Sequence, residues 1–137
     1  MLATHLLDTS VFSQPIKNHP TESVQRHWRR LGDALVCTSS VCLAELIQGL
    51  EARDSTSYWR RYRDLLENRY PVIPFDQADA EIFGKLSGNF RKKGKTRPAL
   101  DLMIACCAIR HDLILATLNA KDFIGIPGLT VEDWSDP

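Results

Sequence analysis

Short apolar runs alternate with longer segments of helical periodicity along the 137 residues of this chain. Runs of this length, bounded by turn-forming residues, predict buried strands, whereas the longer segments repeat their apolar positions every three or four residues. The expected strands are residues 6–8, 34–38, 72–75, 113–117 and 129–134. The expected helices are residues 21–30, 39–50, 55–68, 76–91 and 97–112. Strands separated by helices indicate a parallel α/β sheet, so we expect a three-layer α/β/α sandwich with a mainly parallel central sheet.

The predicted helices differ in which positions face the core. In the second helix we expect Leu43, Ile47 and Leu50 to form the buried stripe, and Ser39 or Ser40 to cap its start. The third helix should turn its apolar residues inward, and these are Tyr58, Tyr62, Leu65 and Leu66. The last helix is apolar on all sides, with Pro98 in its first turn, and therefore predicts a buried element.

Length and composition favour one soluble domain spanning residues 1–137, because 44% of the residues are hydrophobic and 25% are charged. The sequence has neither an apolar run of about 20 residues nor a signal peptide, so we expect a cytoplasmic protein without membrane contact. The cysteines show no C-x-x-C spacing, and we expect all four to be reduced core thiols. The histidines are scattered, which disfavours a zinc site.

The formal net charge is zero, so any nucleic-acid binding must be local. One candidate is the segment "RKKGKTR" at 91–97, directly before the last helix. Its basic residues are Arg91, Lys92, Lys93, Lys95 and Arg97. They are suited to contact an RNA backbone, although a solvated loop explains the segment equally well.

Three acids stand in unusually apolar surroundings. Asp8 ends an apolar strand, Glu45 interrupts "VCLAELI", and Asp101 interrupts "PALDLMIACCAI". A buried carboxylate is costly unless it is hydrogen-bonded, paired or bound to a metal, and no basic residue lies within a helical turn of Glu45 or Asp101. Each acid alone is explained by capping or partial exposure, but the three together indicate a functional cluster.

A weaker fourth acid, Asp122, follows the fourth expected strand, with Asn119 beside it as a neutral oxygen ligand. Side chains at strand ends and helix starts meet at the carboxyl edge of a parallel sheet. A cluster of oxygen ligands there predicts a site for a hard divalent cation, Mg²⁺ or Mn²⁺.

The chain resembles PIN-domain ribonucleases, and among them the VapC toxins of type II toxin–antitoxin systems. The matching segments, in chain order, are "LLDTSVFS", "SSVCLAELIQGLE", "VIPFD", "KKGKTRPALDLMIACCAI", "LATLNAKDF" and "IPGLTVEDW". Together they span nearly the whole chain, which makes the resemblance specific although each segment alone is weak.

The resemblance implies that Asp8, Glu45 and Asp101 are catalytic acids that bind the metal. The fourth acidic position has two candidates. Asn119 occupies a place that is Asp in many PIN domains, while Asp122 matches the acid of a common T-x-N-x-x-[DE]-F form. We favour Asp122, with Asn119 in support.

Two hydroxyl residues follow the first acid of the cluster. Ser10 stands where the family often has Asn. We expect Thr9 and Ser10 to orient Asp8 or a metal-bound water, although capping of the strand end explains them equally well.

The resemblance also implies an activity and partners. The activity is that of a divalent-metal-dependent endoribonuclease cleaving structured RNA such as tRNA, and the partners are a VapB-like antitoxin and a second copy in a homodimer. One alternative is a PIN-like nuclease, or an RNA-binding or protein-binding module, outside any toxin–antitoxin pair. A haloacid-dehalogenase-like phosphatase is disfavoured, because its motif needs a second Asp where this chain has Ser10.

Overall fold

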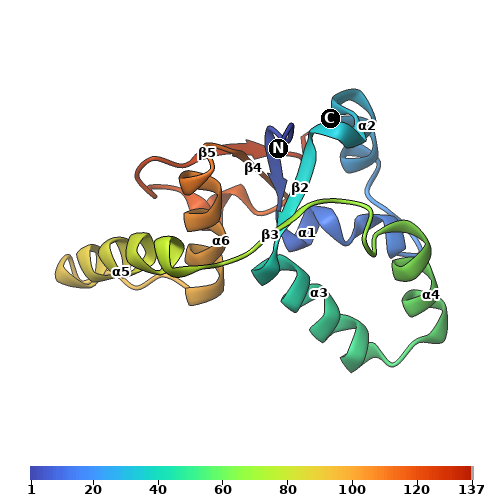
Figure 1. Ribbon diagram of the computed structural model, residues 1–137, viewed down its shortest axis with the longest axis horizontal. Coiled ribbons are helices and arrows are strands. Elements are labelled where there is room, and N and C mark those ends of the chain that lie inside the picture. The colour runs from blue at the N-terminus through green and yellow to red at the C-terminus, as the bar shows by residue number, and fades with distance from the viewer. Residues whose placement is uncertain (137) are drawn as a thin grey trace.

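A five-stranded, wholly parallel sheet forms the centre of the computed structural model, which describes residues 1–136 (Figure 1). The strands are β1 (His5–Leu7), β2 (Val36–Ser39), β3 (Val72–Ile73), β4 (Ile114–Thr117) and β5 (Thr130–Asp133). Their order in the sheet is β3-β2-β1-β4-β5. The predicted parallel sheet is therefore confirmed, and the chain reverses its direction of winding between β1 and β4.

Six α-helices and three short 3-10 helices connect the strands. The α-helices are α1 (Thr9–Phe12), α2 (Glu22–Leu31), α3 (Ser40–Arg53), α4 (Thr56–Leu65), α5 (Gln77–Lys92) and α6 (Ala99–Arg110). The 3-10 helices are η1 (Gln14–Ile16), η2 (Asp33–Leu35) and η3 (Ala120–Phe123). Over residues 1–136, no helix has the length and apolar character that crossing a bilayer requires.

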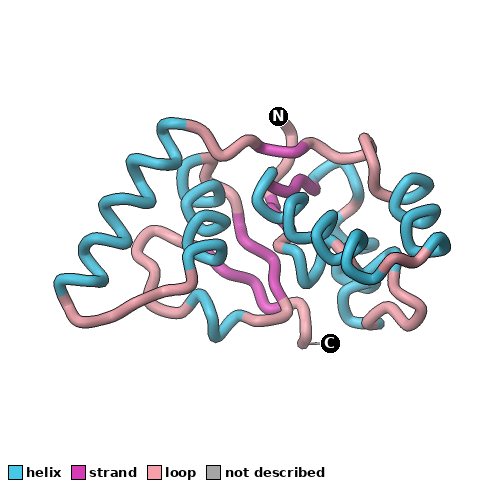
Figure 2. Tube along the Cα trace, turned by 90° about the horizontal axis from the view of Figure 1, so that it is seen from below, coloured by secondary structure: helices cyan, strands magenta, loops and turns pink. Residues whose placement is uncertain are grey.

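The sheet separates two hydrophobic cores, because neighbouring residues of a strand point to opposite faces. Leu6, Cys37 and Leu115 contribute to the core under α5 and α6. Leu7 and Ala116 contribute to the other core, which α1, α2, α3 and α4 cover. Figure 2 shows helices on both sides of the strands, and the three-layer α/β/α sandwich is thus confirmed.

All four cysteines are buried and free, as predicted. Two expectations about helix faces were wrong. Ile47 is 38% exposed, because α3 turns Leu46 rather than Ile47 toward the core. Leu65 is 43% exposed, since α4 ends there rather than near residue 68, whereas Leu66 is buried as predicted. Pro98 lies at the N-cap of α6, one residue before the helix begins.

Three strand ends meet at the carboxyl edge of the sheet, on either side of the reversal between β1 and β4. Asp8 follows β1, Ser39 ends β2, and Thr117 ends β4. Parallel sheets bind ligands at such a point, because the chain turns away in opposite directions and leaves a crevice between the strand ends. The fold thus places the first predicted acid where a site is expected.

Candidate metal centre

Asp8 is held rigidly at the carboxyl end of β1. Its backbone N–H donates to the carbonyl of Ala116 at 3.1 Å, and its carboxylate caps α1 by accepting from the Val11 N–H at 3.3 Å. The side chain is only 6% exposed. Burial raises the pKa of Asp8, although hydrogen bonds from Ser10 and Thr117 oppose that rise. Asp8 therefore does cap a helix, as one explanation from the sequence proposed, but the cap uses only the Oδ1 oxygen of the carboxylate.

Two hydroxyl groups fix the orientation of the Asp8 carboxylate. Ser10 Oγ donates to Oδ1 at 2.5 Å, and Thr117 Oγ1 donates to Oδ2 at 2.6 Å. Each hydroxyl also accepts from the backbone that follows β4, Ser10 from Leu118 N at 3.0 Å and Thr117 from Asn119 N at 2.9 Å. The two hydroxyls therefore tie Asp8 to the segment that carries the fourth predicted position.

Thr117 is a site residue that the sequence reasoning missed. It is fully buried and ends β4, the strand that pairs with β1. A hydroxyl at the end of the apolar run "LILAT" is the same kind of signal as Asp8 at the end of its own run, and it identifies Thr117 once the two strands are known to be neighbours.

Glu45 reaches the same edge from α3. Thr9 Oγ1 donates to Glu45 Oε1 at 2.5 Å, so the two hydroxyl residues after Asp8 serve different carboxylates. Glu45 is half-buried. It lies past the first turn of α3, whose N-cap residue, Ser39, ends β2. Thr9 was expected to orient Asp8 or a metal-bound water, and its hydroxyl donates to Glu45.

Asp101 lies in the first turn of α6, as predicted, and is half-buried. Burial raises the pKa of Asp101, and the negative charges of Asp122, Glu45 and Asp8 raise it further, in that order of importance. The fold thus brings these acids within electrostatic reach of one another. Asp122 lies in η3 and is exposed, as is Asn119 at the start of that turn.

The four carboxylates have a donor set suited to a hard cation. All their ligating atoms are oxygens, and within residues 1–136 none of the four forms an ion pair with a basic side chain. No three Asp, Glu, His or Cys side chains of these residues are already close enough to surround one ion. The other three acids therefore lie within electrostatic reach of Asp101, and none of the four has an ion-pair partner within residues 1–136.

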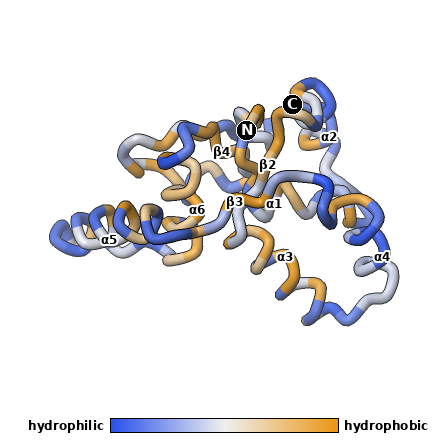
Figure 3. The backbone as a smooth tube through the Cα atoms, viewed as in Figure 1, coloured by the Kyte–Doolittle hydropathy of each residue, from blue (hydrophilic) through white to orange (hydrophobic). Residues whose placement is uncertain are grey.

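The predicted basic segment divides into two parts. Arg91 and Lys92 end α5, at the hydrophilic far end of that helix (Figure 3), and Lys93 and Lys95 follow in the exposed turn. Arg97, in contrast, is half-buried and donates to the backbone carbonyls of Asp122 and Ile124. Four of the five residues are thus free to contact an external anion, while Arg97 is occupied within the protein.

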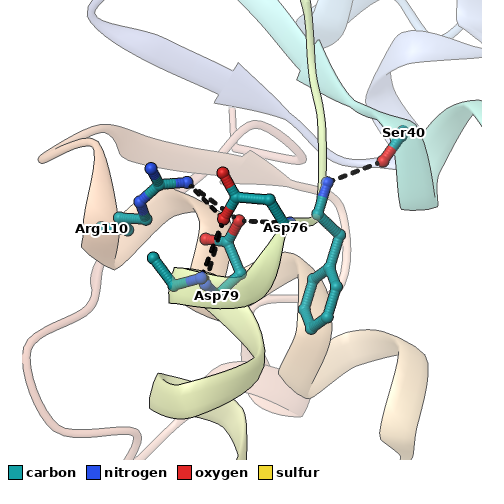
Figure 4. A network of polar contacts seen from close by, with 6 residues as sticks. Ser40, Asp76, Asp79 and Arg110 are labelled. Atoms are coloured by element: carbon teal, nitrogen blue, oxygen red, sulfur yellow. Dashed lines mark hydrogen bonds and ion pairs between the residues drawn. The ribbon is translucent and has the colours of Figure 1, made fainter.

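Asp79 is a second buried aspartate, and the sequence reasoning did not single it out. It is 0% exposed, and Oδ2 accepts from Asp76 N at 2.9 Å and from Arg110 at 3.2 Å (Figure 4). Asp76 and Asp79 form a reciprocal capping box at the start of α5, a D-x-x-D pattern visible in the sequence. Because Arg110 pairs with both acids, this cluster joins α5 to α6 rather than forming a metal site.

Comparison with known proteins places this geometry in a family. The family model described as PIN domain matches residues 5–128. The tRNA(fMet)-specific endonuclease VapC of Shigella flexneri is 32% identical over 130 residues, covering 95% of this chain and 97% of the relative. Ribonuclease VapC1 of Haemophilus influenzae is 29% identical, covering 96% and 98% respectively.

Solved structures agree with the relatives. DNA-bound VapBC from Salmonella typhimurium contains a chain with a TM-score of 0.80 and 31% identity, covering 96% of this chain and 98% of that one. FitAcB from Neisseria gonorrhoeae has a TM-score of 0.86 at 26% identity, covering 97% and 99%. With its fold, its acids and these matches in agreement, this chain belongs to the PIN-domain family and, within it, to the VapC group.

Proposed function

We propose that this chain is a divalent-metal-dependent endoribonuclease and the toxin of a VapBC-type toxin–antitoxin pair, acting on structured RNA such as tRNA. The observation that carries the proposal is the gathering of four acids without a basic partner at the carboxyl edge of the sheet, in a chain similar to ribonucleases named VapC. Residues 1–137 act as one domain in this proposal, which the single continuous sheet supports.

The catalytic acids in this proposal are Asp8, Glu45, Asp101 and Asp122, which bind Mg²⁺ or Mn²⁺, with Asn119 in support. When bound, the cation polarises a phosphodiester oxygen and lowers the pKa of a water molecule. The protein supplies the alignment, because Ser10 and Thr117 hold the Asp8 carboxylate in one orientation and Thr9 holds Glu45. No side chain in the cluster needs to become a covalent nucleophile.

Asp122 is the better candidate than Asn119 for the fourth acid. It is the strongest charged neighbour of Asp101. The backbone N–H of Asn119 already donates to Thr117 Oγ1, which places this residue at the edge of the Asp8 hydrogen-bond network. Asn119 therefore supports the turn that carries Asp122.

RNA reaches the acids along the basic segment that precedes α6. Arg91, Lys92, Lys93 and Lys95 are exposed, and no acid pairs with them within residues 1–136. Their contribution is to hold phosphates by charge, which makes binding weaken with salt.

The antitoxin has a suitable place beside the acids. A pocket between α1, α3 and α4 shares Thr9 and Glu45 with the candidate site, and its floor is apolar through Leu46 and Leu50. A peptide of the partner lying there blocks access to Glu45. The expected homodimer stays a prediction from the family resemblance.

RNA cleavage by the purified chain tests the proposal. Cleavage of a panel of structured RNAs, tRNAs included, is expected with Mg²⁺ or Mn²⁺ and lost with a chelator. Asp8→Asn and Asp101→Asn should each lower kcat/KM more than about 100-fold, because even residues hydrogen-bonded to metal ligands contribute about 10–100-fold. The matched control is Asp64→Asn, which changes an exposed acid of α4.

Two outcomes contradict the proposal. If the wild-type chain cuts none of the RNAs with either metal, or if both variants cut as fast as the wild type, the nuclease assignment fails. Co-purification with the product of a small neighbouring reading frame separates a toxin from a nuclease that acts alone. An inactive chain that still binds RNA supports the alternative of a binding module.

A further inference from the structure

Arg97 joins two segments that are separate in the sequence. It lies in the connection between α5 and α6, and its Nη1 donates to the backbone carbonyl of Asp122 at 3.1 Å. Its Nη2 donates to the carbonyl of Ile124. The guanidinium also stacks over Phe90 of α5, with 4.9 Å between Cζ and the ring centroid. These contacts leave Arg97 half-buried, whereas the lysines of the same segment are exposed.

The turn that Arg97 contacts is also anchored by Phe123, whose side chain is 3% exposed and belongs to the hydrophobic core under α5 and α6. Asp122 N donates to Asn119 O at 2.9 Å within the turn, and the Asp122 side chain is exposed. Gly125 follows with φ of +81°, and a Cβ atom there would lie 3.2 Å from Arg97 Nη2. The positive φ of residue 125 favours glycine, and the backbone at this position lies beside the guanidinium.

The same arginine stands four residues before Asp101, just ahead of the start of α6. Arg97 is thus linked to Asp101 by a short stretch of chain and to the backbone of Asp122 by a hydrogen bond. A planar guanidinium with two parallel donors fixes a backbone turn more rigidly than a lysine ammonium can.

We propose that Arg97 is a positioning residue, whose guanidinium clamps the backbone of residues 122–124 to the start of α6 and so sets the separation of the Asp101 and Asp122 carboxylates. The proposal rests on the proposed function in that these carboxylates bind the cation. Arg97 thereby leaves the set of residues expected to contact RNA, because two of its donors are used inside the protein.

A clamp and a simple charge make opposite predictions. If Arg97 acts only through its positive charge, Arg97→Ala relieves repulsion and the acids bind a cation more tightly. If Arg97 positions Asp122, Arg97→Ala loosens the turn and cation binding weakens. The sign of the change in Mn²⁺ affinity therefore separates the two roles without any RNA being present.

The experiment measures Mn²⁺ binding by EPR titration and amide hydrogen exchange at residues 122–126, both on the full chain. Arg97→Ala should weaken Mn²⁺ binding about 10-fold, the range for groups that orient metal ligands, and speed exchange in the turn. Arg97→Lys keeps the charge without the paired donors and should recover only part of the affinity. The matched control is Lys121→Ala, which removes an exposed charge from the same turn and should leave exchange unchanged.

A double-mutant cycle with Asp122→Asn tests the route of the effect. If Arg97 acts through Asp122, adding Arg97→Ala to Asp122→Asn changes Mn²⁺ affinity no further. The proposal is overturned by any of three results: losses of Mn²⁺ affinity that add in the double variant, tighter Mn²⁺ binding by Arg97→Ala, or unchanged hydrogen exchange in the turn. Lys95→Ala is the contrasting variant, because it removes a charge expected to contact RNA. It should weaken RNA binding and make that binding less dependent on salt, while the Mn²⁺ affinity stays unchanged.

The two proposals fail separately. If the wild-type chain neither binds Mn²⁺ nor cleaves RNA, the proposed function fails, and the hydrogen-exchange comparison still decides the clamp. Faster exchange in Arg97→Ala then supports the clamp, and unchanged exchange overturns it. If the wild-type chain binds Mn²⁺ and Arg97→Ala binds it equally well, only the positioning role is lost.

Discussion

Asp8 and Asp79 are both buried aspartates at the start of a helix, yet their surroundings are opposite. Asp79 forms an ion pair with Arg110 of α6 and belongs to the reciprocal capping box at the start of α5 (Figure 4). Asp8 receives only neutral donors, two hydroxyls and a backbone N–H, and its negative charge contributes to raising the pKa of Asp101. A buried carboxylate that the fold itself neutralises is structural, and one left without a cation is available for chemistry.

The Asp79 cluster shows what compensation looks like in this fold. Burial acts to raise the pKa of Asp76, but the Asp79 N–H and Arg110 outweigh it and hold that pKa below its usual range. At Asp8 the balance is reversed, because burial exceeds the hydrogen bonds and the pKa is raised. Of the two carboxylate oxygens of Asp79, Oδ2 has partners, whereas Oδ1 has no hydrogen-bond partner within the described residues.

The largest expected effect separates the two acids by stability. Arg110→Ala should lower the midpoint of thermal unfolding by on the order of 5–10 °C, because Asp79 is left buried without its cation. Asp8→Asn should leave the midpoint unchanged or raise it in the presence of a chelator, since asparagine still caps α1 and no longer carries a buried charge. Differential scanning calorimetry checks both, with Arg60→Ala on α4 as a control for loss of an exposed arginine.

If Arg110→Ala and Asp8→Asn destabilised the chain equally, both aspartates would have a structural role and the contrast between them would fail. A stabilised Arg110→Ala variant would likewise contradict the view that Asp79 depends on its ion pair.

A smaller effect is expected from the hydroxyls that distinguish Asp8. Thr117→Val keeps the shape of the side chain but removes the donor to Asp8 Oδ2, so kcat/KM for RNA should fall about 10-fold, equivalent to about 1.4 kcal/mol. The loss should appear mainly in kcat and in Mn²⁺ affinity, since Thr117 is buried and cannot contact RNA. The control is Thr130→Val in β5, at an exposed position. Equal kinetics for both variants would show that the hydrogen bond has no role in the site.

The smallest effect is the pH dependence of stability without metal. Because the pKa values of Asp8 and Asp101 are raised in the folded chain, each carboxyl binds its proton more tightly when folded. Their contribution to stability is therefore full below the unfolded value of about 3.9 and is lost as the pH rises through the folded pKa. Denaturant titrations in a chelator should measure the free energy of unfolding of Asp101→Asn and of the wild type. Relative to the wild type, the value for Asp101→Asn should rise between pH 4 and pH 7.

The comparison variant for this pH series is Asp64→Asn, which changes an exposed acid of α4. A gap between Asp101→Asn and the wild type that narrows as the pH rises would contradict the assignment of raised pKa values. Added Mn²⁺ should close the gap by stabilising only the wild type, since a ligand of the folded state shifts unfolding by mass action.

The sequence carried much of the fold because its signals are local. The positions of the strands, the Asp76 cap, the cap at Ser39 or Ser40 and the alternation of elements all follow from neighbouring residues. The structure contains them, with Ser39 as the cap of α3 and with most strands shorter than expected. The faces of α3 and α4 were harder to predict. Which apolar residue of a helix is buried depends on how the helix crosses the sheet, and Ile47 and Leu65 fell on the solvent side.

For the candidate site, the sequence determined that Glu45 and Asp101 lack a basic residue within a helical turn and that Asp8 ends an apolar strand, because these features are visible along the chain. It did not reveal that Thr117 serves Asp8, that Arg97 faces inward, or that Asp79 is paired with Arg110. Those relations join residues 25 to 109 positions apart, across the sheet and between helices. Tertiary structure alone decides which buried charges are compensated, because the partner of each one comes from a distant part of the chain.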